Sequence, residues 1–218
     1  MKNSPLTSKE SLETYKQLKF DIAWYEDALA RAKESADLIK KRAQIARRFS
    51  TRTFDNFDVS RHEDAYNKCL EYVRTYDTAD RNVLILCGNV GTGKTHLACA
   101  IANAILDEGT PVVFSTFGDM LENLKAEFTK NERHYLDDMR LAPMLIIDDI
   151  GKERKSDWTE SIMYNVLNYR YEAMLPTVMT TNMTIKELGT YLGDACFSRI
   201  CETAQVIKFD GSDYRKGK

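Results

Sequence analysis

The chain has 218 residues, of which 43% are hydrophobic and 29% are charged, and its formal net charge is −2. This balance excludes a generally basic nucleic-acid-binding surface, so any basic patch must be local. No apolar run is long enough to span a bilayer, and residues 1–5 lack the apolar region of a signal peptide. The five cysteines form no C-x-x-C pair, which indicates reduced thiols and predicts a cytoplasmic protein.

Residues 8–49 are predicted to be helical, because Trp24 and a series of alanines recur at spacings of three and four. A stripe made mostly of alanine is too thin to build a core alone, so we expect this helix to dock against a partner. Near its end, residues 40–48 hold five basic side chains and no acid. This run is either a solvated helix face or a contact for nucleic-acid phosphates or an acidic partner, and the sequence leaves both open.

The helical periodicity stops over residues 49–59, where Phe54 and Phe57 alternate with turn formers. These aromatic side chains either line a pocket for a nucleotide base or pin the segment to the core. A second amphipathic helix is expected over residues 62–76. Its apolar side is formed by Ala65, Cys69, Tyr72 and Val73.

A glycine-rich stretch at residues 88–95 is the strongest motif of the chain. It reads Gly-Asn-Val-Gly-Thr-Gly-Lys-Thr, which fits the phosphate-loop pattern G-x-x-x-x-G-K-[ST] without a mismatch. An apolar run at 83–87 precedes it and a segment rich in helix formers follows, so it joins a buried strand to a helix. The alternative is a tight turn without a chemical role, but a full match in this setting favours nucleotide binding.

The residue types of this loop suit a triphosphate. Glycines let the backbone N–H groups approach the phosphates without a Cβ in the way. The helix that begins at Lys94 adds its first-turn amides and the positive end of its dipole. We expect the Lys94 ammonium to reach the β- and γ-phosphates and the Thr95 hydroxyl to ligate Mg²⁺. The residues predicted to bind the nucleotide are Gly88, Asn89, Val90, Gly91, Thr92, Gly93, Lys94, Thr95 and His96.

Further strands and helices are predicted to alternate after the loop, which favours an α/β fold with a parallel sheet covered on both faces. Residues 129–140 are polar and charged, and no helix or strand is predicted there. His134, which lies among them, is interpreted as a surface residue. The predicted strands are 112–116, 144–149, 176–181 and 205–209, and the predicted helices are 94–107, 118–128, 157–171 and 184–192.

Two carboxylates, Asp148 and Asp149, end the strand at 144–149. Four apolar residues before them place them at the carboxyl end of the strand, where ligands of such sheets bind. Beside a phosphate loop, one carboxylate there would hold Mg²⁺ and its neighbour would orient the attacking water. The alternative is a pair that caps the next helix or starts a turn, and the phosphate loop favours the chemical interpretation.

The ordered motifs resemble the AAA+ helicase loaders of the DnaC/DnaI type, together with the related IstB-type transposition ATPases. The likeness covers about residues 53–215. Its markers are Thr53 to Phe57, Gly88 to Ala98, Gly118 to Leu121, Leu145 to Gly151, Thr181-Asn182, Phe197 to Ile200 and Gly211 to Arg215. The resemblance implies an AAA+ P-loop NTPase domain over 50–218 with a five-stranded parallel sheet. It also implies an N-terminal helical extension over 1–49 that binds the partner.

The resemblance also implies roles for single residues. Thr95 and Asp148 would be the Mg²⁺ ligands of Walker A and Walker B, and Asp149 would take the place of the catalytic acid. Asn182 would be sensor 1, which touches the γ-phosphate or the water. Arg199 would be the arginine finger for ATP in a neighbouring subunit, and Arg215 the second sensor arginine.

Three departures from the family pattern change these expectations. Many AAA+ ATPases have Glu where this chain has Asp149, which is one methylene shorter, so we expect slow, switch-like hydrolysis. Ala195 and Cys196 stand where DnaC-type loaders carry a further arginine, so the contact between subunits is expected to be reduced. The first fifty residues hold no cysteine, which excludes the zinc module of DnaI-type loaders and favours a DnaC-like helical appendage.

The function implied by the resemblance is ATP-dependent loading of a replicative DNA helicase. The N-terminal helices would grip a DnaB-like hexamer, while the AAA+ domains self-assemble and engage single-stranded DNA. DNA contact would use the run at 40–48 and the scattered basic residues Lys125, Lys130 and Arg133. Three alternatives stay open: an IstB-like ATPase that assists a transposase on duplex DNA, a small-molecule P-loop kinase, and a nucleotide-gated adaptor that does not hydrolyse ATP. The kinase lacks support because no arginine-rich lid segment is found.

Overall fold

The structure is a computed structural model that describes residues 51–78, 81–130, 134–211 and 213–214. The predicted helix at 8–49 with its basic run, and Arg133 and Arg215, lie outside these ranges, as does the side chain of Lys130. Within the described part of the chain, no helix is both long enough and apolar enough to cross a membrane.

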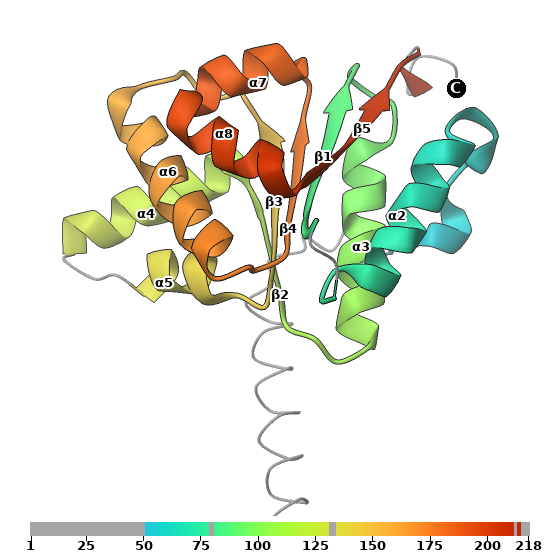
Figure 1. Cartoon of the computed structure of the whole chain (residues 1–218), viewed down its shortest axis with the longest axis horizontal. Coiled ribbons are helices and arrows are strands. Elements are labelled where there is room, and N and C mark those ends of the chain that lie inside the picture. The colour runs from blue at the N-terminus through green and yellow to red at the C-terminus, as the bar shows by residue number, and fades with distance from the viewer. Residues whose placement is uncertain (1–50, 79–80, 131–133, 212, 215–218) are drawn as a thin grey trace, which may run out of the picture. The chain divides into compact units, whose positions relative to one another are not determined.

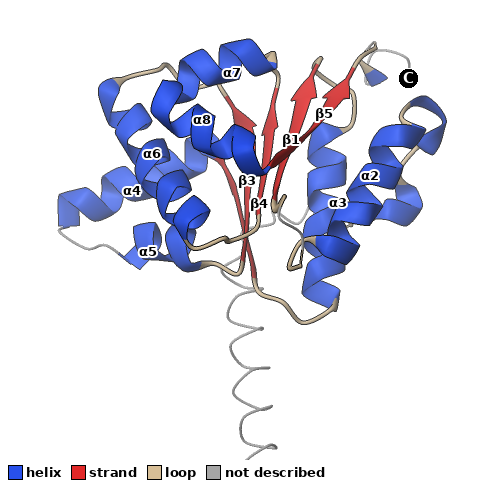
Figure 2. Cartoon of the chain, viewed as in Figure 1, coloured by secondary structure: helices blue, strands red, loops and turns tan. Residues whose placement is uncertain are grey.

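A five-stranded parallel sheet forms the centre of the described region, with the strand order β2-β3-β4-β1-β5 (Figure 2). The strands are β1 (Val83–Gly88), β2 (Val112–Thr116), β3 (Met144–Ile150), β4 (Thr177–Thr181) and β5 (Ala204–Phe209). All of them are parallel, so their carboxyl ends meet at one edge of the sheet. The predicted parallel α/β sheet is therefore confirmed.

Helices cover both faces of this sheet, and Figure 1 shows α2 and α3 on one side and α4 to α8 on the other. The helices are α2 (Glu63–Thr75), α3 (Lys94–Asp107), α4 (Phe117–Lys130), α5 (His134–Leu141), α6 (Asp157–Glu172), α7 (Ile185–Leu192) and α8 (Asp194–Thr203), and two short 3-10 helices precede them, η1 (Phe54–Asn56) and η2 (Val59–Arg61). The apolar side predicted for the second helix is the buried side of α2.

Alternation along β3 divides the core into two clusters. Ile146 packs with α2 and α3, whereas Leu145 and Ile147 pack with the helices of the other face. All three side chains are fully buried, as expected for a central parallel strand, which is covered on both faces.

Two helices were not predicted from the sequence. The first is α5, which spans only eight residues in a segment that is polar by composition. The second is α8, which begins directly after Gly193 without a side-chain cap at its start. Short helices without a clear cap are held by tertiary packing more than by local propensity, and Met139 of α5 and Ile200 of α8 are buried in the core.

Arg170 of α6 is a buried cation that ties several of these elements together. Its side chain is 1% exposed, and its guanidinium donates to the carbonyl oxygens of Met139, Arg140, Ala142 and Pro176 and to the Thr177 hydroxyl. Burial lowers the pKa of Arg170 to about 10, so the guanidinium remains charged at neutral pH. It satisfies carbonyl groups at the end of α5 and fixes the entry of β4.

Candidate functional site

The phosphate loop connects β1 to α3 and adopts a backbone that suits glycine. Gly91 and Gly93 have φ values of +76° and +99°, in a region that other residues rarely occupy. A Cβ added at Gly91 would lie 1.8 Å from Oδ1 of Asp213, and one added at Gly93 would lie 2.8 Å from Cε2 of Phe57. Both glycines are therefore required by backbone conformation and by close packing.

Lys94 opens α3 and turns its side chain back along the loop. Its ammonium donates to the carbonyl oxygens of Gly88 at 2.8 Å and Asn89 at 2.5 Å, and the residue is 6% exposed. The N-cap residue of the helix, Gly93, has no side chain that could accept a hydrogen bond from the first-turn amides of α3. A buried ammonium beside the start of a helix is an arrangement that binds anionic oxygens.

Asp148 and Thr95 meet where β3 and α3 adjoin. The Thr95 hydroxyl donates to Oδ1 of Asp148 at 2.9 Å, and the Thr180 hydroxyl donates to the same oxygen at 2.6 Å. Burial raises the pKa of Asp148 above its usual value, and the hydrogen bonds from Thr180 and Thr95 oppose this shift. Carboxylate and hydroxyl oxygens are ligands that Mg²⁺ accepts, so the donor set fits this ion.

Asp149 lies beside Asp148 in a strained backbone conformation. Its φ is +67°, and the pairing of β3 with β4 shifts register between Ile147 and Ile150. Such an irregularity redirects a side chain at the end of a strand. The Asp149 N–H donates to the Thr180 hydroxyl at 2.8 Å, so Thr180 positions both acids. Thr180 was not predicted as a site residue, and its only sequence signal is its place two residues before Asn182.

The Asp149 carboxylate has a partner at each oxygen. The side-chain amide of Asn182 donates to Oδ1 at 3.0 Å, and the Lys152 ammonium forms an ion pair with Oδ2. The structure thus brings together Asp149 and Asn182, two residues to which the family resemblance assigned roles, and adds Lys152, which was not predicted from the sequence. The only feature of the sequence that points to Lys152 is its position three residues after Asp149.

His96 packs against Phe57, one of the aromatic residues that precede α2. The His96 ring nitrogen is 3.0 Å from the carbonyl oxygen of Thr53, and its ring meets that of Phe57 edge to face. Burial lowers the pKa of His96. Phe57 is buried and stacks on Tyr66 of α2, so it holds this segment against α2 and α3, which is the packing role considered for it.

Comparison with known proteins identifies the family. A family model described as "IstB-like ATP binding protein" matches residues 6–218, which is most of the chain. The chain belongs to this family. Its sheet of five parallel strands and its helical layers form the AAA+ domain that the sequence motifs implied.

Two curated relatives of this IstB-like protein carry different descriptions. It is 31% identical over 153 residues to the replicative helicase loader DnaC of Escherichia coli strain K12, a match that covers 68% of this chain and 62% of that protein. It is 36% identical over 150 residues to the phage-like element PBSX protein XkdC of Bacillus subtilis strain 168, covering 62% of this chain and 56% of that protein. Each match thus spans less than two thirds of the relative.

A solved structure extends the comparison. The crystal structure of the DnaC helicase loader matches this IstB-like protein with a TM-score of 0.69 and 26% sequence identity. The match covers 76% of this chain and the whole of that chain, so the likeness extends through the complete fold of the loader structure.

Arg199 does not join the cluster at the phosphate loop. It lies on α8, where its guanidinium donates to the Tyr164 hydroxyl of α6 at 2.7 Å and lies 5.4 Å from the centre of that ring. Among the described residues, no hydrogen bond or ion pair links Arg199 to the acids of β3. A role at this protein's own phosphate loop is therefore not supported, whereas a role toward a neighbouring subunit is consistent with this placement.

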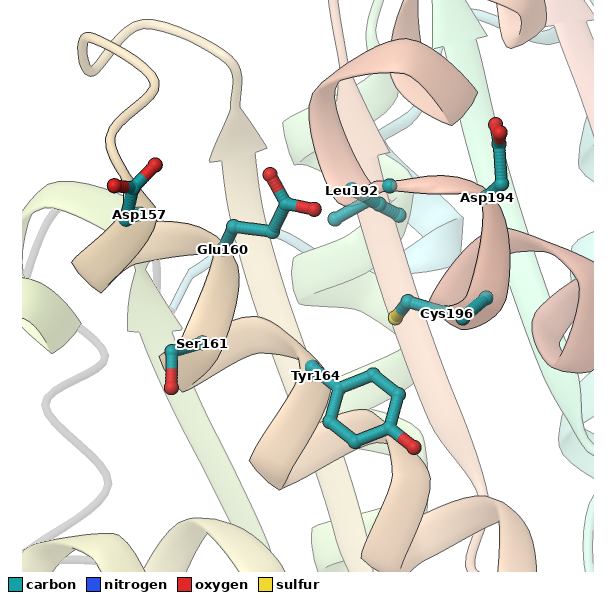
Figure 3. Close-up of a pocket in the computed structure, with 9 residues that line it drawn as sticks. Asp157, Glu160, Ser161, Tyr164, Leu192, Asp194 and Cys196 are labelled. Carbon is teal, nitrogen blue, oxygen red and sulfur yellow. The ribbon is translucent and has the colours of Figure 1, made fainter.

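Tyr164, the partner of Arg199, also lines a pocket of about 480 Å³ (Figure 3). The pocket is formed by residues of α6, the end of α7 and the start of α8. Asp157, Glu160 and Asp194 give it an acidic lining. Cys196 also lines the pocket and is buried, and burial raises the pKa of its thiol to about 12. Ala195 and Cys196, the two positions that depart from the loader pattern, thus line this pocket instead of presenting an arginine.

The segment after β5 lies against the phosphate loop, which the sequence analysis did not foresee. The Asn89 side chain donates to the Gly211 carbonyl oxygen at 3.0 Å, and the Tyr214 N–H donates to the Gly91 carbonyl oxygen at 3.1 Å. Arg61 lies over the Tyr214 ring at 4.7 Å. These contacts hold the residues that precede Arg215 beside the predicted nucleotide site.

Proposed function

We propose that this protein is an ATP-dependent loader of a replicative DNA helicase. The observation that carries the proposal is the match to the whole chain of the DnaC loader structure, at a TM-score of 0.69. The cluster of Lys94, Thr95 and Asp148 at the carboxyl edge of the sheet supports the ATP-binding part. The relatives' names describe their own roles, and the loader role of this chain is our inference from them.

ATP would bind with its phosphates in the loop. Lys94 would pair with the β- and γ-phosphates, while Thr95 and Asp148 would hold Mg²⁺. The bound ion would neutralise charge on the phosphate oxygens.

The remaining predicted residues would act around the γ-phosphate. Asp149 and Asn182 would orient the attacking water. The hydrogen bond between their side chains, at 3.0 Å, supports this shared role. Arg199 would contact the ATP of a neighbouring subunit, and Arg215 would act as the second sensor. We expect slow hydrolysis, since the side chain of Asp149 is shorter than that of the usual Glu.

Residues 1–49 would grip the helicase, and the assembled AAA+ domains would engage single-stranded DNA. Lys125 of α4 is a described candidate for DNA contact, and its ammonium lies 5.2 Å from the centre of the Trp158 ring. A cation beside an aromatic face can serve phosphate and base contacts together. DNA affinity would then fall steeply with salt.

Size-exclusion chromatography with light scattering tests this proposal. The protein is mixed with the replicative helicase of its source, with ATP and Mg²⁺, beside a variant that lacks residues 1–49. We expect a stable complex with the full chain and none with the truncated chain. Lys94→Ala serves as a control for the nucleotide requirement. A full chain that binds ATP but forms no complex with the helicase would contradict the loader role.

A second candidate is an ATPase that assists a transposase on duplex DNA, because the matching family model is the IstB-like one. The same chromatography separates the two candidates when duplex DNA and a transposase replace the helicase. A complex that forms only with duplex DNA and transposase would favour this second function.

A further inference from the structure

Lys152 lies in the short segment between β3 and α6 and contacts the acid proposed to orient water. Its ammonium pairs with Oδ2 of Asp149, while Asn182 donates to Oδ1 at 3.0 Å. The Asp149 backbone is fixed as well, by its N–H bond to Thr180 at 2.8 Å. The carboxylate is therefore held at its backbone and at both of its oxygens.

We propose that Lys152 is a positioning residue that restrains Asp149 and keeps ATP hydrolysis slow. The inference rests on the proposed ATPase function. In hydrolysis, the water oxygen bonds to the γ-phosphorus, the bond from that phosphorus to the bridging oxygen breaks, and its electron pair leaves with ADP. A base accepts a proton of the water. Lys152 competes with that water for an oxygen of Asp149 and fixes the plane of the carboxylate.

The exposure of the two side chains makes this restraint reversible. The Lys152 side chain is 67% exposed and that of Asp149 is 23% exposed. Partly solvated ion pairs are weak and are readily exchanged for water contacts. The lysine thus lies where a helicase partner or a neighbouring subunit can reach it, while the acid remains within the site.

Lys155 provides a matched comparison in the same segment. Its ammonium pairs with Glu160 at 2.8 Å and donates to the Thr190 carbonyl oxygen at 2.6 Å. These partners belong to α6 and α7 rather than to β3. Loss of Lys155 removes one positive charge from the segment but leaves the partners of Asp149 in place.

Steady-state ATP hydrolysis tests the proposal with the full-length protein and the variants Lys152→Met, Lys152→Arg and Lys155→Met. We expect Lys152→Met to raise kcat roughly two- to fivefold, the range that a partly exposed ion pair supports, with KM for ATP unchanged. Lys152→Arg keeps the ion pair and should retain the slow rate, as should Lys155→Met. A kcat of Lys152→Met equal to or below that of the unsubstituted protein would overturn the inference.

Two further measurements separate this inference from the proposed function. Binding of a fluorescent ATP analogue shows that each variant still takes up nucleotide, and circular dichroism shows that it is folded. If Lys94→Ala hydrolyses ATP as fast as the unsubstituted protein does, the hydrolysis does not come from this site, and the ATPase proposal itself fails. If that hydrolysis is present but Lys152→Met and Lys155→Met give the same kcat, only the role of Lys152 fails.

Discussion

Gly91 shows how a single residue links the phosphate loop to the end of the chain. A side chain there would collide with Asp213, and the segment around Asp213 is hydrogen-bonded to the loop through Tyr214. Any change that displaces this contact moves the loop backbone, and with it the N–H groups proposed to hold the phosphates. Nucleotide affinity should therefore depend on a position that carries no functional group.

Gly91→Ala is expected to weaken ATP binding by about tenfold or more, which corresponds to about 1.4 kcal/mol. The added Cβ would lie 1.8 Å from Oδ1 of Asp213, and the φ of +76° is unfavourable for alanine. Titration calorimetry with ATP measures the change.

Gly109→Ala is the control, because its φ is +88° but nothing lies within 4 Å of the added Cβ. It should cost about 1 kcal/mol of stability and leave ATP affinity unchanged. Equal affinities for Gly91→Ala and the unsubstituted protein would show that the close contact at the loop is unimportant.

The loop and Asp148 could be predicted from the sequence, because eight consecutive residues and a strand end define them locally. Thr180 could not, since its contact with Asp149 depends on the pairing of β3 with β4 and on the register shift there. Lys152 could not either, because its ion pair with Asp149 depends on how the chain turns after β3. Sequence patterns report spacing along one element and do not show such contacts. The roles assigned to the site residues remain predictions.

At the scale of elements, Arg170 adds a buried polar link to the apolar packing of α6 against the sheet. Its guanidinium supplies donors to five oxygens on the segments around α5 and β4. A planar fork of N–H groups can satisfy several acceptors in fixed directions, and a lysine ammonium cannot reproduce that geometry.

Arg170→Lys is therefore expected to destabilise the protein by about 3 kcal/mol, because buried carbonyl groups lose their donors. Urea unfolding followed by circular dichroism measures the loss. Arg74→Lys, at an exposed position of α2, should change stability by less than about 0.5 kcal/mol. An effect of that small size for Arg170→Lys would contradict the structural role of the buried guanidinium.

The order of strands and helices was largely predictable because apolar runs and helical periodicities are strong in β1, α3 and β3. The helices α5 and α8 were missed, since they are short and owe their helical state to packing against the core. Arg170 was also missed, because a single arginine in an amphipathic helix has the sequence pattern of a surface residue.

At the scale of the whole molecule, the predicted site residues fall into two groups. Lys94, Thr95, Asp148, Asp149 and Asn182 meet at the carboxyl edge of the sheet, whereas Arg199 contacts Tyr164 beside the acidic pocket. This placement of Arg199 on α8 is consistent with the proposed assembly, in which one subunit supplies the loop and its neighbour supplies the arginine.

The measurement that tests the central claim most directly is helicase loading onto circular single-stranded DNA, which has no free end for a closed ring to thread. The replicative helicase of the source is incubated with the circle, ATP and Mg²⁺, and unwinding of an annealed, tailed oligonucleotide is followed. We expect this protein to increase unwinding strongly, and Lys94→Ala to fail because it cannot hold the phosphates. The account would be contradicted if the helicase unwound the oligonucleotide equally in three reactions: with this protein, with Lys94→Ala, and with neither.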